Sequence, residues 1–183
     1  MGVFTRFLSV LAADAPDPNT ISIDATCFKA HCTASSLRLK KGGRGCLIGR
    51  TKGGMNTKLH AVSDKVGRRI VFFMTAGQVS DYTEARALVN SLPSADWLLA
   101  DWGYDADFFP EFLVDRGIAR RISPRKSRDK PIKYDKRGFK RRNRMDIMFG
   151  HLKGCRRIST RHDRCPKVFL SAIALAATIL FRL

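Results

Sequence analysis

The sequence predicts an α/β protein in which a mixed β-sheet is flanked by helices. Three segments rich in β-formers come first, at 20–28, 57–64 and 69–76. Two shorter apolar segments, at 97–101 and 117–122, then alternate with helical patterns. Three consecutive strands followed by strand–helix alternation favour a sheet with both antiparallel and parallel pairs. The length of 183 residues is that of one ordinary domain.

The first elements are an amphipathic helix at 3–13, which ends before two prolines, and the strand TISIDATCF. Asp24 is expected near the end of that strand because apolar residues alternate before it. Residues 32–56 are rich in Gly, Lys and Arg and predict a flexible basic loop. TKLHAVSD and RIVFFMTA then read as two strands joined by a turn at 65–67.

Short strands and helices alternate in the second half. Ser80 or Asp81 can cap a helix that runs to about Leu92. WLLAD is a continuous apolar run that ends in Asp101, as expected for a buried central strand. The remaining predicted elements are a helix at 107–115, a strand at 117–122, a basic linker at 123–135 and the apolar helix VFLSAIALAATILF at 168–181. That last run has fourteen residues, too few to span a bilayer comfortably, so we expect a core helix.

The run GFKRRNRMDIMFGHLKGC predicts a helix with one acid in a stripe of cations. At 3.6 residues per turn, Phe139, Arg142, Asp146 and Lys153 fall within about 60° of one face. A carboxylate held among arginines and lysines is suited to holding a divalent metal against a phosphodiester. Because Arg142 and Lys153 share the face of Asp146, we expect them to contact phosphates; the alternative is that they are ordinary solvated cations.

The charge is large and unevenly placed. The net charge is +18, and residues 120–161 hold 17 of the 34 Lys and Arg against three acids. Residues 38–58 hold seven more bases and no acid. Two basic patches on a mildly acidic body indicate a groove that follows a polyanion backbone, although a basic ribosome- or membrane-surface protein has the same charge.

The cysteines indicate a reducing compartment. Cys27, Cys32, Cys46, Cys155 and Cys165 are odd in number and form no C-x-x-C pair or Cys/His metal spacing. FLSVLAADA is a poor signal peptide because its apolar stretch is short and interrupted. We therefore expect a cytoplasmic protein that does not enter a membrane.

Three acids form a candidate metal-binding triad. Asp24 and Asp101 each belong to a strand segment, and ligands of α/β sheets bind at the carboxyl ends of neighbouring strands. If the two strands are neighbours, both acids face one cleft, and the helix with Asp146 lies across that edge. The alternative for each strand acid is a turn or cap residue. His31 and His60 are expected to be structural.

Five segments resemble the catalytic domain of bacterial insertion-sequence transposases of the DDE class: SIDATCFKAH, TKGGMNTKLHAVSD, TAGQVSDYTEA, LLADWGYDAD and RHDRCPKVFLSAIALAATILF. The subgroup is the one whose last motif is Tyr, two residues, Arg, three residues, Glu, six residues, Lys. The resemblance implies a ribonuclease H-like fold, Mg²⁺-dependent cutting of the element's ends, with Mn²⁺ as a substitute, and strand transfer into target DNA. It places the catalytic and metal-binding acids at Asp24, Asp101 and Asp146, in a catalytic domain at 20–183 that follows a helix remnant at 1–19.

The departures from the family pattern matter for activity. Asp146 stands where the family has Glu, and Phe139 stands where it has Tyr; Trp102, His151, Cys155, Cys32 and Cys46 replace residues usual in the family. An aspartate carboxylate lies about 1.3 Å short of a glutamate's, and a misplacement of about 1 Å can cost about a hundredfold in rate. We therefore expect weakened activity.

The expected partner is double-stranded DNA, both the element's ends and the target. The family's N-terminal DNA-binding helices are expected from self-association, from a partner reading frame, or not at all in a truncated copy. Non-specific contacts are assigned to cations on the helix and loop: Arg141, Arg142, Arg144, Lys153, Arg156, Arg157, Lys40, Lys41, Arg44, Arg50 and Lys52. The alternative function is an inactive DNA-binding or inhibitory fragment; a general nuclease or resolvase fits the acids but not the helix motif.

Overall fold

The architecture is taken from a computed structural model. It describes residues 3, 19–36, 46–64, 70–80, 92, 94–101, 104, 113–122 and 143–182.

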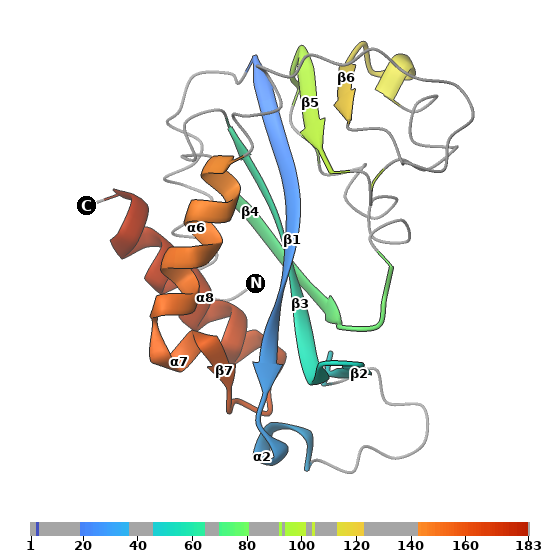
Figure 1. Ribbon diagram of the computed structural model, residues 1–183. Helices are drawn as coiled ribbons and strands as arrows, with labels where there is room; N and C mark the ends of the chain where they lie inside the picture. Colours follow the sequence, from blue (N-terminus) through green and yellow to red (C-terminus); the bar gives the residue numbers. More distant parts are fainter. Residues whose placement is uncertain are drawn as a thin grey trace.

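One sheet organises the described part of the chain (Figure 1). Five strands run in the order β2-β3-β1-β5-β6, while β4 pairs with β3 and β7 pairs with β1. The strands are β1 (Thr20–Ala30), β2 (Gly49–Thr51), β3 (Gly54–Asp64), β4 (Ile70–Ala76), β5 (Trp97–Ala100), β6 (Ala119–Ile122) and β7 (Thr160–Arg161).

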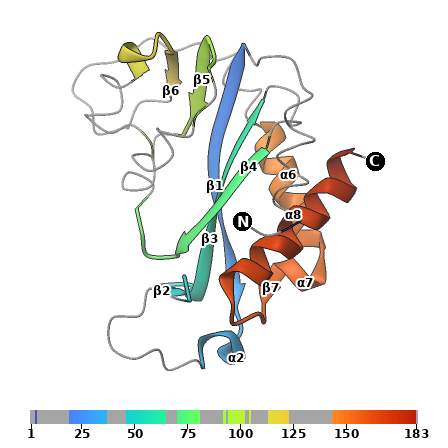
Figure 2. The same cartoon turned by 180° about the vertical axis from the view of Figure 1, so that it is seen from behind.

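The last helices of the described chain are α6 (Asn143–Gly154), the short α7 (Arg156–Ser159) and α8 (Pro166–Arg182). A further short helix, α2 (Cys32–Ser35), follows β1. Figures 1 and 2 show α6 and α8 together on one side of β1, with β5 and β6 on its other side. α6 contacts β1, and α8 contacts β4 and α6.

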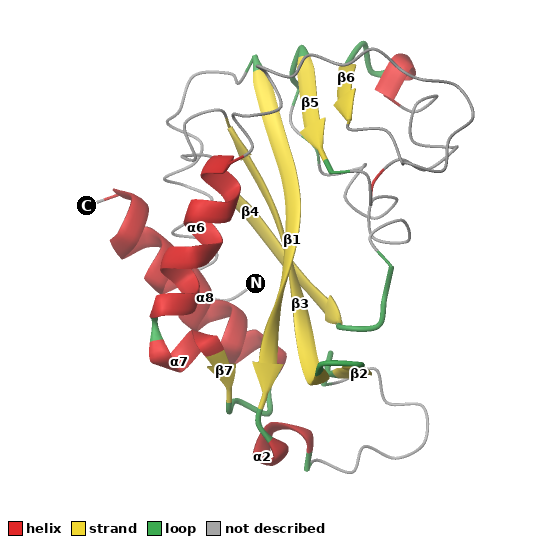
Figure 3. Ribbon diagram, in the orientation of Figure 1, coloured by secondary structure: helices red, strands yellow, loops and turns green. Residues whose placement is uncertain are grey.

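The pairing directions confirm the predicted mixed α/β sheet (Figure 3). β1 pairs antiparallel with β3, and β3 pairs antiparallel with β4. On its other edge, β1 pairs in parallel with β5, which in turn pairs in parallel with β6. β1 is therefore the strand at which the antiparallel half meets the parallel half. Its first five residues are all buried, as expected for a central strand.

Alternate strand residues supply two apolar cores, one on each face. The helix-side core lies between the sheet and the helices: Phe28, Leu59, Ala61, Phe72, Met74, Met145, Met148, Phe149, Leu152, Ile158, Phe169, Ile173, Ala174 and Ala177. The far-side core covers the opposite face: Ile21, Ile23, Val62, Leu92, Leu98, Ala100, Tyr104, Leu113 and Ile118. Each fully buried Leu, Ile or Phe contributes about 1.5–3 kcal/mol, so both faces stabilise the sheet.

Helix α8 is confirmed as a core helix. It buries Phe169, Ile173, Ala174 and Ala177 at the i, i+4, i+5 and i+8 spacing of one helix face. Pro166 occupies its first position, where the missing N–H leaves no bond unmade. No helix in the described ranges is long and apolar enough to cross a membrane.

Two expectations about the first half are wrong. Asp24 is not near a strand end, because β1 continues for six residues beyond it to Ala30. The basic segment 32–56 is not wholly a loop, since it contains α2, β2 and the start of β3. Local ordering explains this: the His31 side chain accepts a hydrogen bond from the Thr33 amide at the start of α2. β2 gains its order by pairing with residues 54–56.

Of the other predicted elements, some are confirmed and some lie outside the described residues. The strands at 57–64, 69–76, 97–101 and 117–122 are confirmed as β3, β4, β5 and β6. The stripe helix is confirmed from Asn143 onward as α6. Helices expected at 3–13, 83–92 and 107–115 lie largely outside the described residues, as do the 123–135 linker and nearly all of the 1–19 segment. α7 and β7 were not predicted.

Acid should destabilise this fold through His60. Burial, and to a smaller extent the positive charge of Lys58, lowers the pKa of His60 from 6.5 to about 3. Between these values the unfolded chain binds a proton that the folded chain does not, so stability falls as pH falls below about 6.5. We expect urea unfolding to show a His60-dependent loss of about 2 kcal/mol from pH 7 to pH 5. Equal losses in the wild type and in His60→Gln would contradict this.

Candidate active site

The register of β1 with β5 brings Asp24 and Asp101 level with each other. Thr20 pairs with Trp97, and Ser22 pairs with Leu99. Asp24 lies two residues after Ser22, and Asp101 lies two residues after Leu99. Neighbouring strands lie about 4.8 Å apart, so the two acids start from adjacent backbone positions.

The two acids also share a face of the sheet. Ile21, Ile23, Leu98 and Ala100 all belong to the far-side core. Because side chains alternate along a strand, Asp24 and the position after Ala100 project to the other face, where α6 and α8 pack. Asp24 and Asp101 therefore occupy one face of the sheet on neighbouring strands.

Asp24 lies deeper than Asp101. Its residue is only 9% exposed, while Asp101 is half-buried. The Asp24 carboxylate accepts a hydrogen bond from the Ala25 amide at 2.9 Å. On the other edge of β1, Asp24 is paired with Ala61, whose methyl group occupies little space beside the carboxylate.

Helix α6 begins close to this pair. The Ser63 hydroxyl donates to the Met145 sulfur at 2.8 Å. Ser63 is paired with Ser22, two residues before Asp24 on β1. The first turn of α6 therefore lies over the sheet within one or two residues of the level of the acids.

Asp146 occupies the flank of α6. The helix buries Met145, Met148, Phe149 and Leu152, whereas Asp146 and Lys153 are exposed. These two residues lie about 20° apart around the helix axis, so the described half of the predicted stripe is confirmed. Figure 1 shows α6 running in the same direction as β1. The β5–β6 connection contributes Tyr104 and Leu113 to the far-side core. Connections between parallel neighbouring strands are right-handed. With that hand for the β5–β6 connection, and because α6 is a right-handed helix, the flank of α6 that carries Asp146 is directed toward β5.

The three acids are not gathered into a metal cage. Among the described residues, no group of three or more His, Cys, Asp or Glu side chains is placed to hold a metal ion. Asp24 and Asp101 stand at one level and on one face of the sheet, and both offer carboxylate oxygens, which are the ligands that hard cations prefer. The two residues therefore fit a shared hard cation. Asp146 is directed toward the same side but stays on the exposed flank of its helix.

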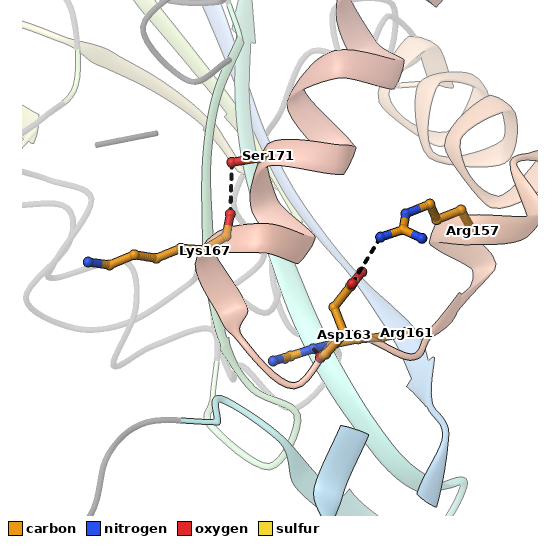
Figure 4. A network of polar contacts seen from close by, with 5 residues as sticks. All are labelled: Arg157, Arg161, Asp163, Lys167 and Ser171. Atoms are coloured by element: carbon orange, nitrogen blue, oxygen red, sulfur yellow. Dashed lines mark hydrogen bonds and ion pairs between the residues drawn. The ribbon is translucent and has the colours of Figure 1, made fainter. Parts of the chain in front are cut away.

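The predicted DNA contacts are exposed where they are described. This holds for Arg50 and Lys52 around β2, for Arg144 and Lys153 on α6, and for Arg156 and Arg157 on α7. Arg157 is already engaged, because its guanidinium donates to the Asp163 carboxylate at 2.9 Å (Figure 4). Lys40, Lys41, Arg44, Arg141 and Arg142 lie outside the described residues, as do Phe139 and Trp102.

Arg161 is a residue whose role the sequence pattern hides. It counts among the cations of the basic patch, yet its side chain is fully buried. Its guanidinium donates to the Thr57 hydroxyl at 2.8 Å, to the Asp163 carbonyl at 2.8 Å and to the Arg164 carbonyl at 3.0 Å. It also lies 5.4 Å from the centre of the Phe169 ring. Burial lowers the pKa of Arg161, with a smaller opposing effect from Cys46 and Asp163.

These contacts make Arg161 a structural cation. It ties β7 and the loop before α8 to β3, and Figure 4 shows its side chain beside Asp163 at the start of that loop. Neither the spacing nor the composition of RHDRCP distinguishes it from a solvated arginine. The backbone of Arg161 pairs with Ala30 of β1, so the residue is part of the sheet.

Comparison with known proteins decides the family. Residues 98–181 match the family model described as "Transposase DDE domain". The chain is 31% identical, over 130 residues, to a Brucella ovis protein assigned as a transposase for insertion sequence element IS6501. That alignment covers 69% of this chain and 98% of the Brucella ovis protein. The chain belongs to the insertion-sequence transposases of the DDE class.

Two solved structures are more distant likenesses of this transposase. The HTLV-2 integrase catalytic core domain, in complex with magnesium, is 15% identical with a TM-score of 0.47, over 91% of this chain and 89% of that one. A chain of the simian T-cell lymphotropic virus intasome, in complex with PP2A regulatory subunit B56 gamma, is 14% identical with a TM-score of 0.43, over 88% and 49%. The family model spans Asp101 and Asp146 but begins after Asp24.

Removing one acceptor of Arg161 should destabilise the transposase. In Thr57→Val, a buried guanidinium N–H and the Leu47 carbonyl, to which the Thr57 hydroxyl donates, both lose a partner. We expect the free energy of unfolding to fall by about 1–3 kcal/mol in urea denaturation. The matched control, Thr178→Val, removes a hydroxyl that donates to the Ala174 carbonyl within α8, and it should cost less. Equal losses in the two variants would refute the structural role of Arg161.

Proposed function

We propose that this chain is the catalytic domain of an insertion-sequence transposase, which cleaves DNA at the element's ends and joins them to target DNA. The observation that carries the proposal is the β1–β5 register, because Asp24 and Asp101 both stand two residues beyond its last pair, Ser22 with Leu99. Family membership supplies the reaction class. The ribonuclease H-like domain at 20–183 is part of the same proposal.

The roles of the three acids at the metal are assigned from their burial and from the elements that carry them. Asp24, on the central strand, and Asp101, on the neighbouring strand, would hold the ion through their carboxylate oxygens. Asp146, in the first turn of α6, would supply the third carboxylate. Mg²⁺ is the expected ion, with Mn²⁺ as a substitute. When bound, such ions supply an activated water or 3′-hydroxyl and stabilise the leaving oxygen of the phosphodiester.

The third ligand limits the rate. Asp146 is exposed, and among the described residues the three acids form no metal-binding group. Mg²⁺ demands octahedral geometry with oxygens at about 2.0–2.1 Å, so a short side chain on the helix flank fits poorly. We infer weakened activity in Mg²⁺ and a smaller defect in Mn²⁺.

The exposed position of Asp146 also favours a second function. A chain whose third acid does not reach the other two binds DNA without cutting it, and it inhibits an active transposase by occupying the ends. In either case the partners are double-stranded DNA and another transposase chain, by self-association or by a partner frame that supplies the DNA-binding region. The cytoplasm and its nucleoid are the expected location.

The basic residues divide the DNA surface into two zones. Lys153 follows Asp146 along the same flank of α6, within reach of a backbone held at the acids. Arg50, Lys52 and Arg156 belong to elements at the other end of β1, where β7 pairs with Lys29 and Ala30. Six residues of strand, about 20 Å, separate Asp24 from that end, so these cations contact DNA that flanks the cleavage site.

Cleavage of a labelled duplex that carries the element's end tests the proposal. Asp146→Glu should raise the rate in Mg²⁺ by about 10- to 100-fold, because the carboxylate then reaches further toward the strand acids. Asp24→Asn and Asp101→Asn should abolish cleavage in both metals. Asp115→Asn, which changes an exposed acid away from the site, is the matched control and should leave the rate unchanged. Cleavage that survives Asp24→Asn would contradict the proposed site.

Salt dependence of DNA binding distinguishes two neighbouring arginines. Arg156→Gln should reduce the slope of log K against log[KCl] by about 0.9, the value for one lost phosphate contact. Arg157→Gln should reduce it by less, because Asp163 already neutralises much of the Arg157 charge. Fluorescence anisotropy with one duplex, measured from low to moderate KCl, gives both slopes. A larger change for Arg157→Gln would place the DNA on the other side of α7.

A further inference from the structure

A row of hydrogen-bonded side chains crosses the face of the sheet opposite the acids. The buried His60 ring on β3 bonds through Nε2 to the Thr75 hydroxyl of β4 at 3.0 Å. Its other nitrogen, Nδ1, lies 3.4 Å from the hydroxyl of Tyr104. Tyr104 is 1% exposed and belongs to the far-side core. The row thus connects the antiparallel half of the sheet to the segment that follows β5.

The central ring of this row is fixed. His60 stacks on Phe73, its cross-strand partner on β4, with ring centroids 4.4 Å apart and planes at 13°. Its lowered pKa keeps the imidazole neutral, so one nitrogen donates and the other accepts. Rotation of the ring would break both bonds and the stacking contact, and the ring therefore provides a rigid anchor for the Tyr104 hydroxyl.

Tyr104 in turn holds the backbone of Asp101. Its amide donates to the Asp101 carbonyl at 2.9 Å, which closes a turn directly after β5. Asp101 lies one residue beyond the end of β5 at Ala100. The register pairs of β5 with β1 and with β6 end at Leu99 and Ala100, respectively. Strand pairing alone therefore does not reach Asp101. The turn anchored by Tyr104 continues the ordered backbone as far as that residue.

We propose that His60 and Tyr104 are positioning residues that hold Asp101 at the level of Asp24. The inference rests on the proposed function, in which those two acids share a metal ion. His60 and Tyr104 lie on the opposite face of the sheet from the acids and act through the backbone of the turn. Loss of the Tyr104 hydroxyl lets the turn shift, and the carboxylate of Asp101 shifts with it.

Direct Mn²⁺ binding, measured by electron paramagnetic resonance of the free ion, tests this proposal without requiring catalysis. Tyr104→Phe keeps the ring and removes only the hydroxyl, and it should raise the Mn²⁺ dissociation constant by about 5- to 10-fold. His60→Leu should raise it by a similar factor. His60→Asn keeps a hydrogen-bonding group near the Nδ1 position and should restore most of the affinity. Ile118→Val, in the same core but outside the row, is the matched control and should bind as the wild type does.

The outcomes separate the positioning proposal from the proposed function. If Asp24→Asn leaves Mn²⁺ binding unchanged, the shared metal site itself is wrong. If Asp24→Asn removes binding while Tyr104→Phe and His60→Leu bind Mn²⁺ like the wild type, the positioning role is overturned. If Ile118→Val weakens binding as much as Tyr104→Phe does, the effect belongs to core packing and the proposal also fails. Should Tyr104→Phe not fold, the difference between His60→Asn and His60→Leu decides.

Discussion

Parallel pairing between β1 and β5 is the constraint on which the site depends. The two strands belong to segments 77 residues apart in the chain, and their register is fixed by the backbone ladder from Thr20 with Trp97 to Ser22 with Leu99. A slip of one residue would send Asp101 to the far-side face and Leu98 toward the helices. The apolar residues of β5, which are buried in the far-side core, therefore hold the acid in place by opposing any such slip.

Each face of the sheet makes a different contribution to this arrangement. The helix side supplies the space into which Asp24 and Asp101 project, and α6 begins there over Ser63. The far side supplies rigidity, through the far-side core and through the polar row that ends at Tyr104. At the other end of β1, Arg161 fixes the chain between α7 and α8. Arg161 and His60 are thus buried where elements distant in sequence meet, and both side chains are hydrogen-bonded.

The sequence is sufficient for β1, β3, β4, β5 and β6, because continuous or alternating apolar runs mark buried strands. It does not predict that Asp24 lies mid-strand, since the exposed Cys27 and Lys29 disguise the continuation of β1. The burial of Arg161 is also hidden, because a two-residue strand has no period to detect and its partner is 131 residues away. The level of Asp24 with Asp101 depends on long-range pairing, which local patterns do not contain.

Iron-directed cleavage of the polypeptide tests the central claim most directly. Fe²⁺ that replaces Mg²⁺ generates hydroxyl radicals with ascorbate and peroxide, and these cut the chain near the bound ion. A shared site on Asp24 and Asp101 predicts cuts near both residues, with a weaker cut near Asp146, and the loss of all of them in either Asp24→Asn or Asp101→Asn. Cuts near only one acid, or cuts that survive both substitutions, would contradict the shared metal site.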